Sequence, residues 1–394
     1  MKILHTADWH LGNVLYSYER INEEEFCLKQ LSDIVKKEQP DCMVVSGDVF
    51  NNIAPKASVQ KLYVQSMLKI HEACPTMTIV VTSGNHDSPS KLEVDSSLWE
   101  YFNLFVVGNI KRNDGEIDYQ EHIIPIKDKY QKIIGYVAAV PFFYQRNAPD
   151  FINNLLKYLN EINTDNLPVV LSNHAAITSC EIKSKALHVQ DFEFIEFENI
   201  VPLYDYMALG HIHYPQTLKN TNNKARYAGS PLAVSFNEDY RHSVTIVDIE
   251  KNIKNGIRTI DIEDKAPLVN IPKEHKIFSE ALFFLSSTEE FKGKYICLNV
   301  LIEDFLPFGA KQHAIEICNK LGAKFCTFDI QRIIDKENKN SFACVTTEEF
   351  KNFTPVYVAK KYFESQNIEL NADFEKMIIE AQNFDYSNNN IILK

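Results

Sequence analysis

Short, almost continuous apolar runs recur through the first 265 residues of the chain. We predict six buried strands there, at 2–8, 41–48, 78–85, 133–140, 167–174 and 206–213. Runs without alternation indicate burial on both faces, as in a sheet covered by helices or by a second sheet. Apolar residues at helical spacing lie between the first strands, at 23–38 and 58–73. The alternation predicts an α/β fold.

The pattern changes between residues 264 and 272 and then forms a second, smaller unit. Residues 294–305 predict a strand and residues 310–322 a helix that ends at a glycine. Residues 324–334 predict another strand. This order indicates a small βαβ-like unit after the main domain.

A polar linker at 335–341 precedes two predicted helices within 346–382. The first helix starts with Thr346, Thr347, Glu348 and Glu349, a capping-box pattern. The second starts near Asn371 and places four apolar side chains on one face: Phe374, Met377, Ile378 and Ala381. The sequence leaves open whether this face packs on the chain's own domain or on a partner.

Composition narrows the class of protein. With 394 residues, 45% of them hydrophobic and 24% charged, the chain is expected to be a globular protein with one large domain and smaller additions. No run is long and apolar enough for a membrane helix, and the first residues lack the apolar core of a signal peptide. Eight scattered cysteines without a C-x-x-C pair favour reduced thiols. We therefore expect a cytoplasmic protein.

The net charge of −12 argues against a module that grips nucleic acid by itself, because such modules usually have a basic surface. The charge does not exclude a nuclease subunit whose partner and bound metal ions supply part of the contact with DNA.

Polar residues of metal-ligand type follow five of the six predicted strands. They are Asp8, His10, Asp48, Asn85, His86, Asp87, His174, His211 and His213. Ligands bind at the carboxyl ends of strands in α/β sheets, so we expect these side chains to converge. Any one histidine alone would more simply be a buried, hydrogen-bonded residue. Packing does not explain the whole ordered set.

The set has the composition of a two-metal site. Two divalent cations that cleave a phosphoester need a shared carboxylate and a mixture of imidazole and oxygen ligands. Asp48, after Gly47, is the natural bridging carboxylate. Two pairs lie two residues apart, so each would share one side of an extended strand: Asp8 with His10, and His211 with His213. Imidazoles favour Mn, Fe or Zn over Mg. By contrast, we expect His5 to be a core residue.

These motifs resemble those of the calcineurin-like metallophosphoesterases, and within them the bacterial nuclease subunits of the SbcD type. The resemblance is carried by Lys2 to Gly12, by Ala208 to His213, and by Tyr227 to Leu232 running on to Ser235 and Phe236. It implies a two-sheet sandwich flanked by helices at residues 1–265. It also implies a small α+β capping domain that contacts DNA at 266–335 and C-terminal helices that bind an SbcC-type ATPase at 345–394.

The resemblance also implies roles for the residues. One Mn²⁺ would be bound by Asp8, His10, Asp48 and His213, and the other by Asp48, Asn85, His174 and His211. His86 would be the general acid or transition-state stabiliser, and Asp87 would orient it. Many relatives have Asp at the end of the G-D-x-x-D motif where this chain has Asn51, a departure that affects the surroundings of the site more than the ligand set.

The implied activity is cleavage of DNA in end processing, repair and recombination. It comprises 3′→5′ exonuclease action on duplex ends and endonuclease action on single strands and hairpins. The chain has no P-loop motif, which fits an effector subunit whose ATPase lies on another chain. Relatives form homodimers through helices that would correspond to 58–72 and 90–102 here.

The sequence leaves two alternatives open. One is a stand-alone phosphodiesterase for a small substrate, which would not need the 130 residues after 264. The other is a scaffold that kept the fold and lost the chemistry, which the complete ligand set disfavours.

Overall fold

The computed structural model describes residues 1–143, 148–182, 194–219, 221–249, 256–287, 290–333 and 371–382, with positions 354, 356–357, 359–360 and 363. It divides into two compact units, Met1–Gln331 and Arg332–Lys394.

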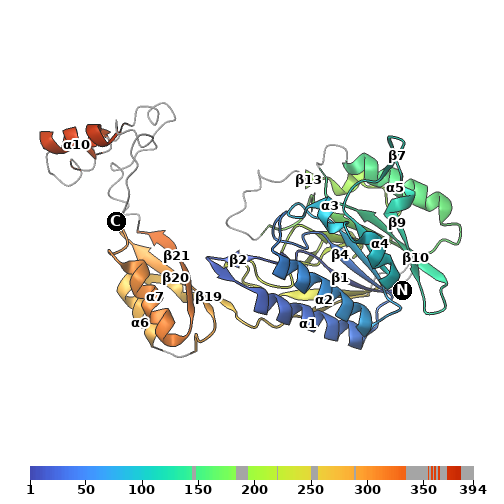
Figure 1. Ribbon diagram of the computed structural model, residues 1–394, viewed down its shortest axis with the longest axis horizontal. Coiled ribbons are helices and arrows are strands. Elements are labelled where there is room, and N and C mark those ends of the chain that lie inside the picture. Colours follow the sequence, from blue (N-terminus) through green and yellow to red (C-terminus); the bar gives the residue numbers. More distant parts are fainter. Residues whose placement is uncertain are drawn as a thin grey trace. The chain divides into compact units, whose positions relative to one another are not determined.

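Two six-stranded sheets dominate the first unit (Figure 1). The first sheet has the order β18 (Gly256–Asp261), β17 (Ser243–Asp248), β1 (Lys2–Thr6), β4 (Cys42–Ser46), β5 (Thr78–Thr82), β6 (Leu104–Val107). The second has the order β15 (Gln216–Thr217), β16 (Ala225–Tyr227), β14 (Tyr206–Gly210), β11 (Val169–His174), β10 (Ile133–Val140), β9 (Ile123–Lys127). In both sheets the central strands run parallel, so their carboxyl ends lie at one edge.

The sheets pack against each other through side chains that are almost fully buried. Ile3, Val44 and Val80 of the first sheet meet Val137, Val170 and Ala208 of the second. Burying a valine or isoleucine completely stabilises the fold by about 1.5–3 kcal/mol, so this layer contributes strongly to stability.

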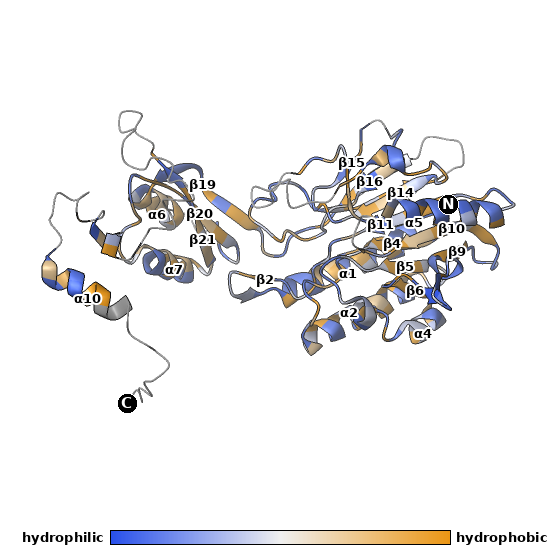
Figure 2. Cartoon of the chain, turned by 90° about the horizontal axis from the view of Figure 1, so that it is seen from above, coloured by the Kyte–Doolittle hydropathy of each residue, from blue (hydrophilic) through white to orange (hydrophobic). Residues whose placement is uncertain are grey.

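Helices cover the outer face of each sheet. α1 (Ile21–Glu38) and α2 (Ala57–Ala73) cover the first sheet with Leu28, Leu31, Met67 and Ile70, and α5 (Ala148–Ile162) covers the second with Phe151, Leu155 and Leu159. The strands are therefore apolar on both faces and the helices on one (Figure 2). The predicted two-sheet sandwich flanked by helices is confirmed.

Shorter elements connect these layers. They are the strand pairs β2 (Val14–Leu15) with β3 (Tyr18–Glu19), β7 (Arg112–Asn113) with β8 (Glu116–Ile117), and β12 (Ala176–Ile177) with β13 (Phe194–Ile195), and the helices α3 (Pro89–Leu92), α4 (Ser96–Trp99), η1 (Glu100–Phe102), η2 (Gln120–His122) and η5 (Phe197–Asn199).

Residues 268–332 form a smaller three-stranded sheet with its own apolar cluster. Its strands are β19 (Leu268–Ile277), β20 (Tyr295–Ile302) and β21 (Lys324–Arg332), and its helices are α6 (Phe278–Ser286) and α7 (Ala310–Leu321). The β20–α7–β21 order agrees with the predicted unit, and α7 ends at Gly322 with φ of 67°. The domain boundaries at 265 and 335 stay a prediction.

In the second unit, α10 (Ala372–Gln382) confirms the second predicted C-terminal helix. The start of the first, at Thr346, lies outside the described residues. Across the described part of the chain, no helix combines the length and the apolar composition needed to cross a membrane.

Candidate metal centre

Apart from His174, which is the last residue of β11, the candidate ligands lie in turns beyond the strand ends. Asp8, His10, Asp48 and His211 all adopt the left-handed backbone region, with φ of 54°, 46°, 51° and 91°. Such φ values are costly for residues other than glycine and gather at functional sites. The prediction that each two-residue pair shares one side of an extended strand is wrong, because β1 ends at Thr6 and β14 at Gly210. The turns bring these side chains together.

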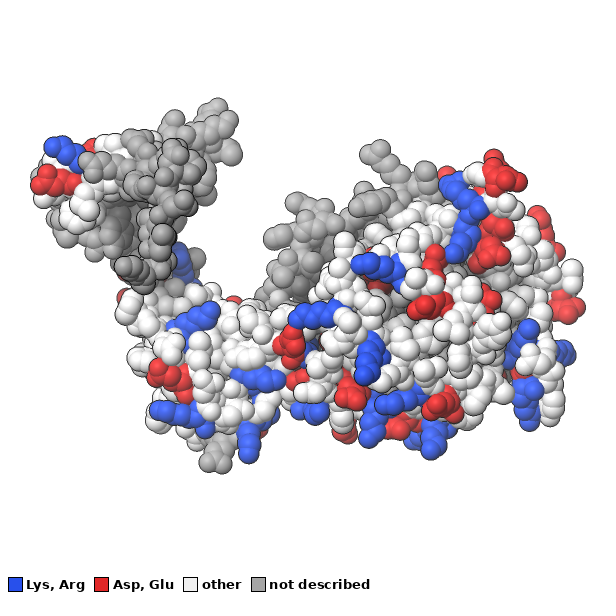
Figure 3. Space-filling model, in the orientation of Figure 1, with Lys and Arg blue, Asp and Glu red and all other residues white. Residues whose placement is uncertain are grey.

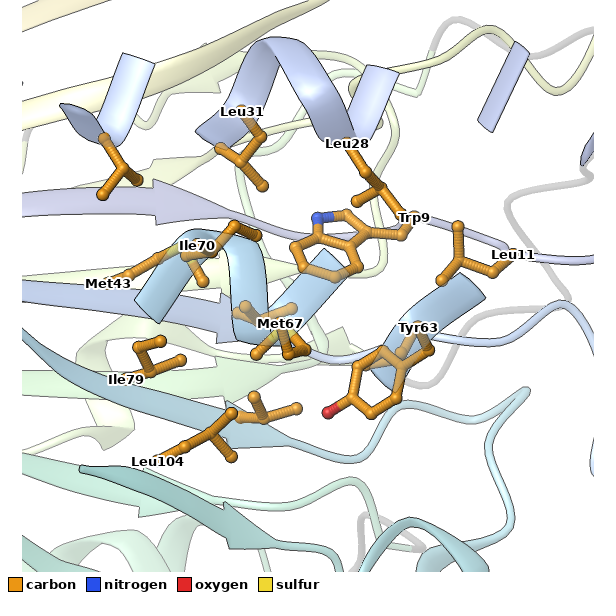
Figure 4. Packing of buried hydrophobic residues seen from close by; sticks show 14 of the residues in the cluster. Trp9, Leu11, Leu28, Leu31, Met43, Tyr63, Met67, Ile70, Ile79 and Leu104 are labelled. Atoms are coloured by element: carbon orange, nitrogen blue, oxygen red, sulfur yellow. The ribbon is translucent and has the colours of Figure 1, made fainter. Parts of the chain in front are cut away.

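Trp9 explains how the turn after β1 is held. Its indole is 3% exposed and packs into the cluster beneath α1 and α2 (Figure 4), while its Nε1 donates to Thr6 Oγ1 at 2.9 Å. The main chain of this turn runs beside the turn after β4, since Asp8 N donates to Gly47 O and His10 N to Asp48 O, both at 3.0 Å. The apolar anchor between them leaves Asp8 and His10 to face the site.

One group of side chains contains Asp8, His10 and His213. The Nε2 atoms of the two imidazoles are 3.0 Å apart, and Asp8 accepts a hydrogen bond from His211 N at 2.9 Å. His213 Nδ1 lies 3.0 Å from Glu238 Oε1. Because a carboxylate only accepts, the neutral His213 ring carries its proton on Nδ1, and its Nε2 then offers a lone pair toward His10.

A second group contains Asn85, His174 and His211. Asn85 Oδ1 lies 3.1 Å from His174 Nε2 and 2.9 Å from His211 Nδ1. His174 Nδ1 donates to the main-chain oxygen of Ser46 at 2.8 Å. In the neutral His174 ring, Nε2 therefore carries a lone pair, which faces another acceptor, Asn85 Oδ1.

Asp48 lies between the two groups. Its Oδ2 is 3.6 Å from His10 Nε2 and 3.4 Å from His174 Nε2. Its Oδ1 accepts the main-chain N–H of His86 at 2.8 Å. One carboxylate oxygen is thus shared by the two groups, which is the arrangement that a bridging ligand requires.

Burial and charge set the protonation of these groups. Burial lowers the pKa of His10 and of His211 to about 3, so both rings are neutral. Burial opposes ionisation of Asp48, but the adjacent His174 outweighs it and lowers the pKa of Asp48 below its usual range. Burial also opposes protonation of His174, yet Asp48 and Asp8 raise its pKa to about 9.

The donor set fits divalent metal ions. In the metal-free protein, the proton on His174 compensates the negative charge of the buried carboxylates. A bound cation would displace this proton. Neutral imidazoles, carboxylates and one amide oxygen are ligands that Mn²⁺ and its neighbours accept. His10 Nδ1, Asp8 and Asp48 are buried, whereas Asn85 and His86 are exposed, so the floor of the site is buried and its rim is open.

Three glycines make room for these ligands. A Cβ at Gly47 would lie 2.2 Å from His174 Nδ1, one at Gly84 would lie 2.1 Å from Asp48 Oδ1, and one at Gly210 would lie 1.9 Å from Ser46 O. Glycine is required at each position because the ligand or its anchor packs directly on the main chain.

Gly210→Ala should therefore destabilise the protein. The added methyl group would overlap Ser46 O and approach His174 Nδ1 to 2.8 Å, and such overpacking typically costs about 1–3 kcal/mol of the free energy of unfolding. Gly256→Ala is the matched control, because its Cβ would come no nearer than 3.6 Å to a neighbour. Urea denaturation of both variants checks this, and equal unfolding midpoints would contradict it.

His86 and Asp87 follow the turn after β5. The exposed His86 ring lies edge-on to His10, with centroids 4.9 Å apart, and its Nδ1 donates to Asn51 O at 3.1 Å. The buried Asp87 carboxylate accepts the main-chain N–H groups of Gly84, Val49 and Phe50. It ties the turns after β4 and β5 together. A direct role in orienting His86 stays a prediction.

Two further residues complete the comparison with the sequence-based expectations. His5 is fully buried, and its Nδ1 lies 2.9 Å from the hydroxyl of Tyr206, as expected for a core residue. Glu238, the partner of His213, was not predicted. The one sequence feature that points to Glu238 is its place two residues beyond the 227–236 stretch that carries the family resemblance. It has no ligand-like spacing to another candidate residue.

Comparison with known proteins gives matches over most of the chain. Residues 1–215 match the family described as calcineurin-like phosphoesterase. The chain is 29% identical over 297 residues to the SbcD subunit of the SbcCD nuclease of Rhodobacter capsulatus, covering 70% of this chain and 72% of that protein. It is 26% identical over 378 residues to the protein of the same name from Bacillus subtilis, covering 93% of each. Since the family match spans more than half of the 394 residues and includes the turns described above, the chain belongs to the calcineurin-like phosphoesterase family.

Proposed function

We propose that this chain is a two-metal DNA nuclease and the nuclease subunit of a complex with an SbcC-type ATPase. The observation that carries the proposal is the meeting of two imidazole-rich groups on one shared carboxylate, Asp48. Similarity to a nuclease subunit over 93% of the chain supports DNA as the substrate. The proposed reactions are 3′→5′ exonuclease action on duplex ends and endonuclease action on single strands and hairpins.

The proposed metal ligands follow the two groups. Asp8, His10, Asp48 and His213 would hold one ion, and Asp48, Asn85, His174 and His211 the other. Four imidazoles in this set favour Mn²⁺ over Mg²⁺. When bound, the two ions would activate water and stabilise the attacking and leaving oxygens at phosphorus.

His86 is the proposed proton donor to the leaving oxygen. Its Nδ1 is engaged by Asn51 O, so Nε2 remains for the proton that passes to the substrate. Its ring is exposed at the rim, where a phosphodiester can reach it. Its main-chain N–H donates to Asp48 Oδ1, which holds the main chain of the proposed acid beside the shared carboxylate.

Surface charge favours a partner in DNA binding. On the face in Figure 3, Lys and Arg are interspersed with Asp and Glu over the first unit, in keeping with the net charge of −12. A partner's basic groups would supply the contact with the phosphate backbone. In the described part of the chain all seven cysteines are free thiols, which supports the proposed cytoplasmic location.

We place the proposed homodimer surface on the short helices after β5. Val94, Leu98 and Tyr101 are 76%, 58% and 87% exposed there. Other apolar residues of the predicted dimer helices, 58–72 and 90–102, pack within the domain instead: Val59, Leu62, Tyr63 and Trp99 are buried in the cluster under α2, and Phe102 packs against it. Of the apolar residues named here, Val94, Leu98 and Tyr101 are the ones exposed to a second copy.

The proposed ATPase-binding element is α10. Its Phe374 and Met377 are 55% and 62% exposed, an apolar face on a helix that needs a partner surface. The bands of apolar residues along α10 are visible in Figure 2.

Deleting residues 346–394 should leave Mn²⁺-dependent cleavage intact and abolish co-purification with the ATPase. The reason is that the metal centre lies in the first compact unit, which ends at Gln331. A full-length Phe374→Ser/Met377→Ser variant serves as a narrower test of the same face. Continued co-purification of the truncated chain would place the interface elsewhere.

The function itself is tested by substrate choice. The purified chain should cut a labelled DNA hairpin with Mn²⁺, and more slowly with Mg²⁺. Turnover of a generic aryl phosphodiester alone, with DNA untouched even after the ATPase is added, would instead indicate a phosphodiesterase for small substrates.

A further inference from the structure

The segment from Gly229 to His242 lies directly behind two of the proposed ligands. Ser230 N donates to the main-chain oxygen of His213 at 3.2 Å, and the Ser230 hydroxyl lies 2.8 Å from the main-chain oxygen of Asp8. A Cβ at Gly229, whose φ is 75°, would lie 2.4 Å from His213 O. The segment therefore follows the main chain of both ligands closely.

Glu238 is the side chain through which this segment reaches an imidazole. The carboxylate is 8% exposed, and its Oε1 lies 3.0 Å from His213 Nδ1. Its Oε2 accepts the N–H of Val234 at 3.1 Å and lies 4.0 Å from His242 Nε2. His242 Nδ1 in turn donates to Ser230 O at 2.8 Å. Both carboxylate oxygens thus have a fixed partner.

We propose that Glu238 is a positioning residue for one metal ion: it holds His213 with the proton on Nδ1 and the Nε2 lone pair directed to the ion. This inference rests on the proposed role of His213 as a ligand. The other ring nitrogen of His213, Nε2, lies 3.0 Å from His10 Nε2. An ion held by both residues would have to be bound next to these two atoms. A carboxylate or carbonyl behind a ligating histidine fixes the tautomer and ring orientation in this way.

A comparison within the site supports the assignment. His174 is held through its Nδ1 by a main-chain oxygen, that of Ser46. His213 has a carboxylate in the equivalent position, so one side-chain substitution can test its support. Glutamine at 238 could turn its amide N–H toward Nδ1 and favour the opposite tautomer, which would direct the proton toward the ion.

Isothermal titration of metal-free, full-length protein with Mn²⁺ tests the proposal. In Glu238→Gln, one of two sites should lose about 10–100-fold in affinity while the other is unchanged, the range expected for a residue behind a ligand. Glu238→Asp keeps the charge and should recover part of the loss. Glu181→Gln is the matched control, because Glu181 is 51% exposed in an ion pair with Lys219.

Circular dichroism establishes that each variant is folded, and Glu238→Asp decides the matter if Glu238→Gln does not fold. Wild-type protein that binds two ions, together with a folded Glu238→Gln variant that binds both as tightly, would overturn this inference alone; where Glu238→Gln does not fold, undiminished binding of both ions by Glu238→Asp would do so. Wild-type protein that binds no Mn²⁺ would overturn the proposed metal site, and the inference with it. Selective loss at one site, with Glu181→Gln unchanged, is the result we expect.

Discussion

Replacing Asp48 with alanine should empty both metal sites at once and reduce DNA cleavage by more than about 10⁴-fold. Its Oδ2 lies 3.6 Å from His10 Nε2 and 3.4 Å from His174 Nε2, so one oxygen of this carboxylate lies between the two ligand groups. Without it, each group loses both a donor and the negative charge that attracts a cation. Metal analysis after equilibration with Mn²⁺, together with hairpin cleavage, measures both effects.

Two companion variants separate charge from structure. Asp48→Asn keeps an oxygen that can accept the N–H of His86 but removes the charge, so it should also fail to hold metal. Asp261→Ala removes an exposed carboxylate paired with Arg241 and should change neither measurement. Retention of one full equivalent of metal by Asp48→Ala would show that Asp48 does not bridge the ions.

His86→Ala should keep both metal ions and lose about 10²–10⁴-fold in cleavage, the usual contribution of a general acid. Alanine preserves the main-chain N–H that holds Asp48 Oδ1, so the metal centre is retained. Only the ring that Asn51 O orients is removed. Metal content and single-turnover cleavage separate binding from chemistry.

The control for this variant is His313→Ala, which removes an exposed histidine of α7. Full cleavage by His86→Ala would remove this residue from the mechanism. Loss of a metal ion would instead identify His86 as a ligand. The geometry allows this role, because ligand atoms of His10, Asp48 and His86 lie within 4.8 Å of one another.

Much of the fold could be predicted because the strands are buried on both faces. Met43 and Val45 of β4 face the helices while Cys42 and Val44 face the second sheet, so the run 42–45 is apolar throughout. β19 and α6 were not predicted. β19 is largely exposed or half-exposed and carries Lys273, Glu274 and Lys276, which interrupt the apolar pattern on which the strand predictions depend.

The convergence of the candidate ligands could be predicted, but its geometric cause could not. Sequence order placed Asp8, Asp48 and His211 at strand ends, and the structure brings them together. Their left-handed backbone conformations were not predicted, because glycine is the residue that usually marks such turns. Glu238 could not be predicted for a related reason: it reaches His213 across 25 positions of the chain.

A crystal structure of the Mn²⁺-loaded protein, with anomalous diffraction at the manganese edge, would show directly whether Asp48 bridges two ions. We expect two peaks about 3.5–4 Å apart, on either side of Asp48. One peak should lie by His10 and His213, and the other by His174 and His211. A single peak, or two peaks of which neither contacts Asp48, would contradict the two-metal site.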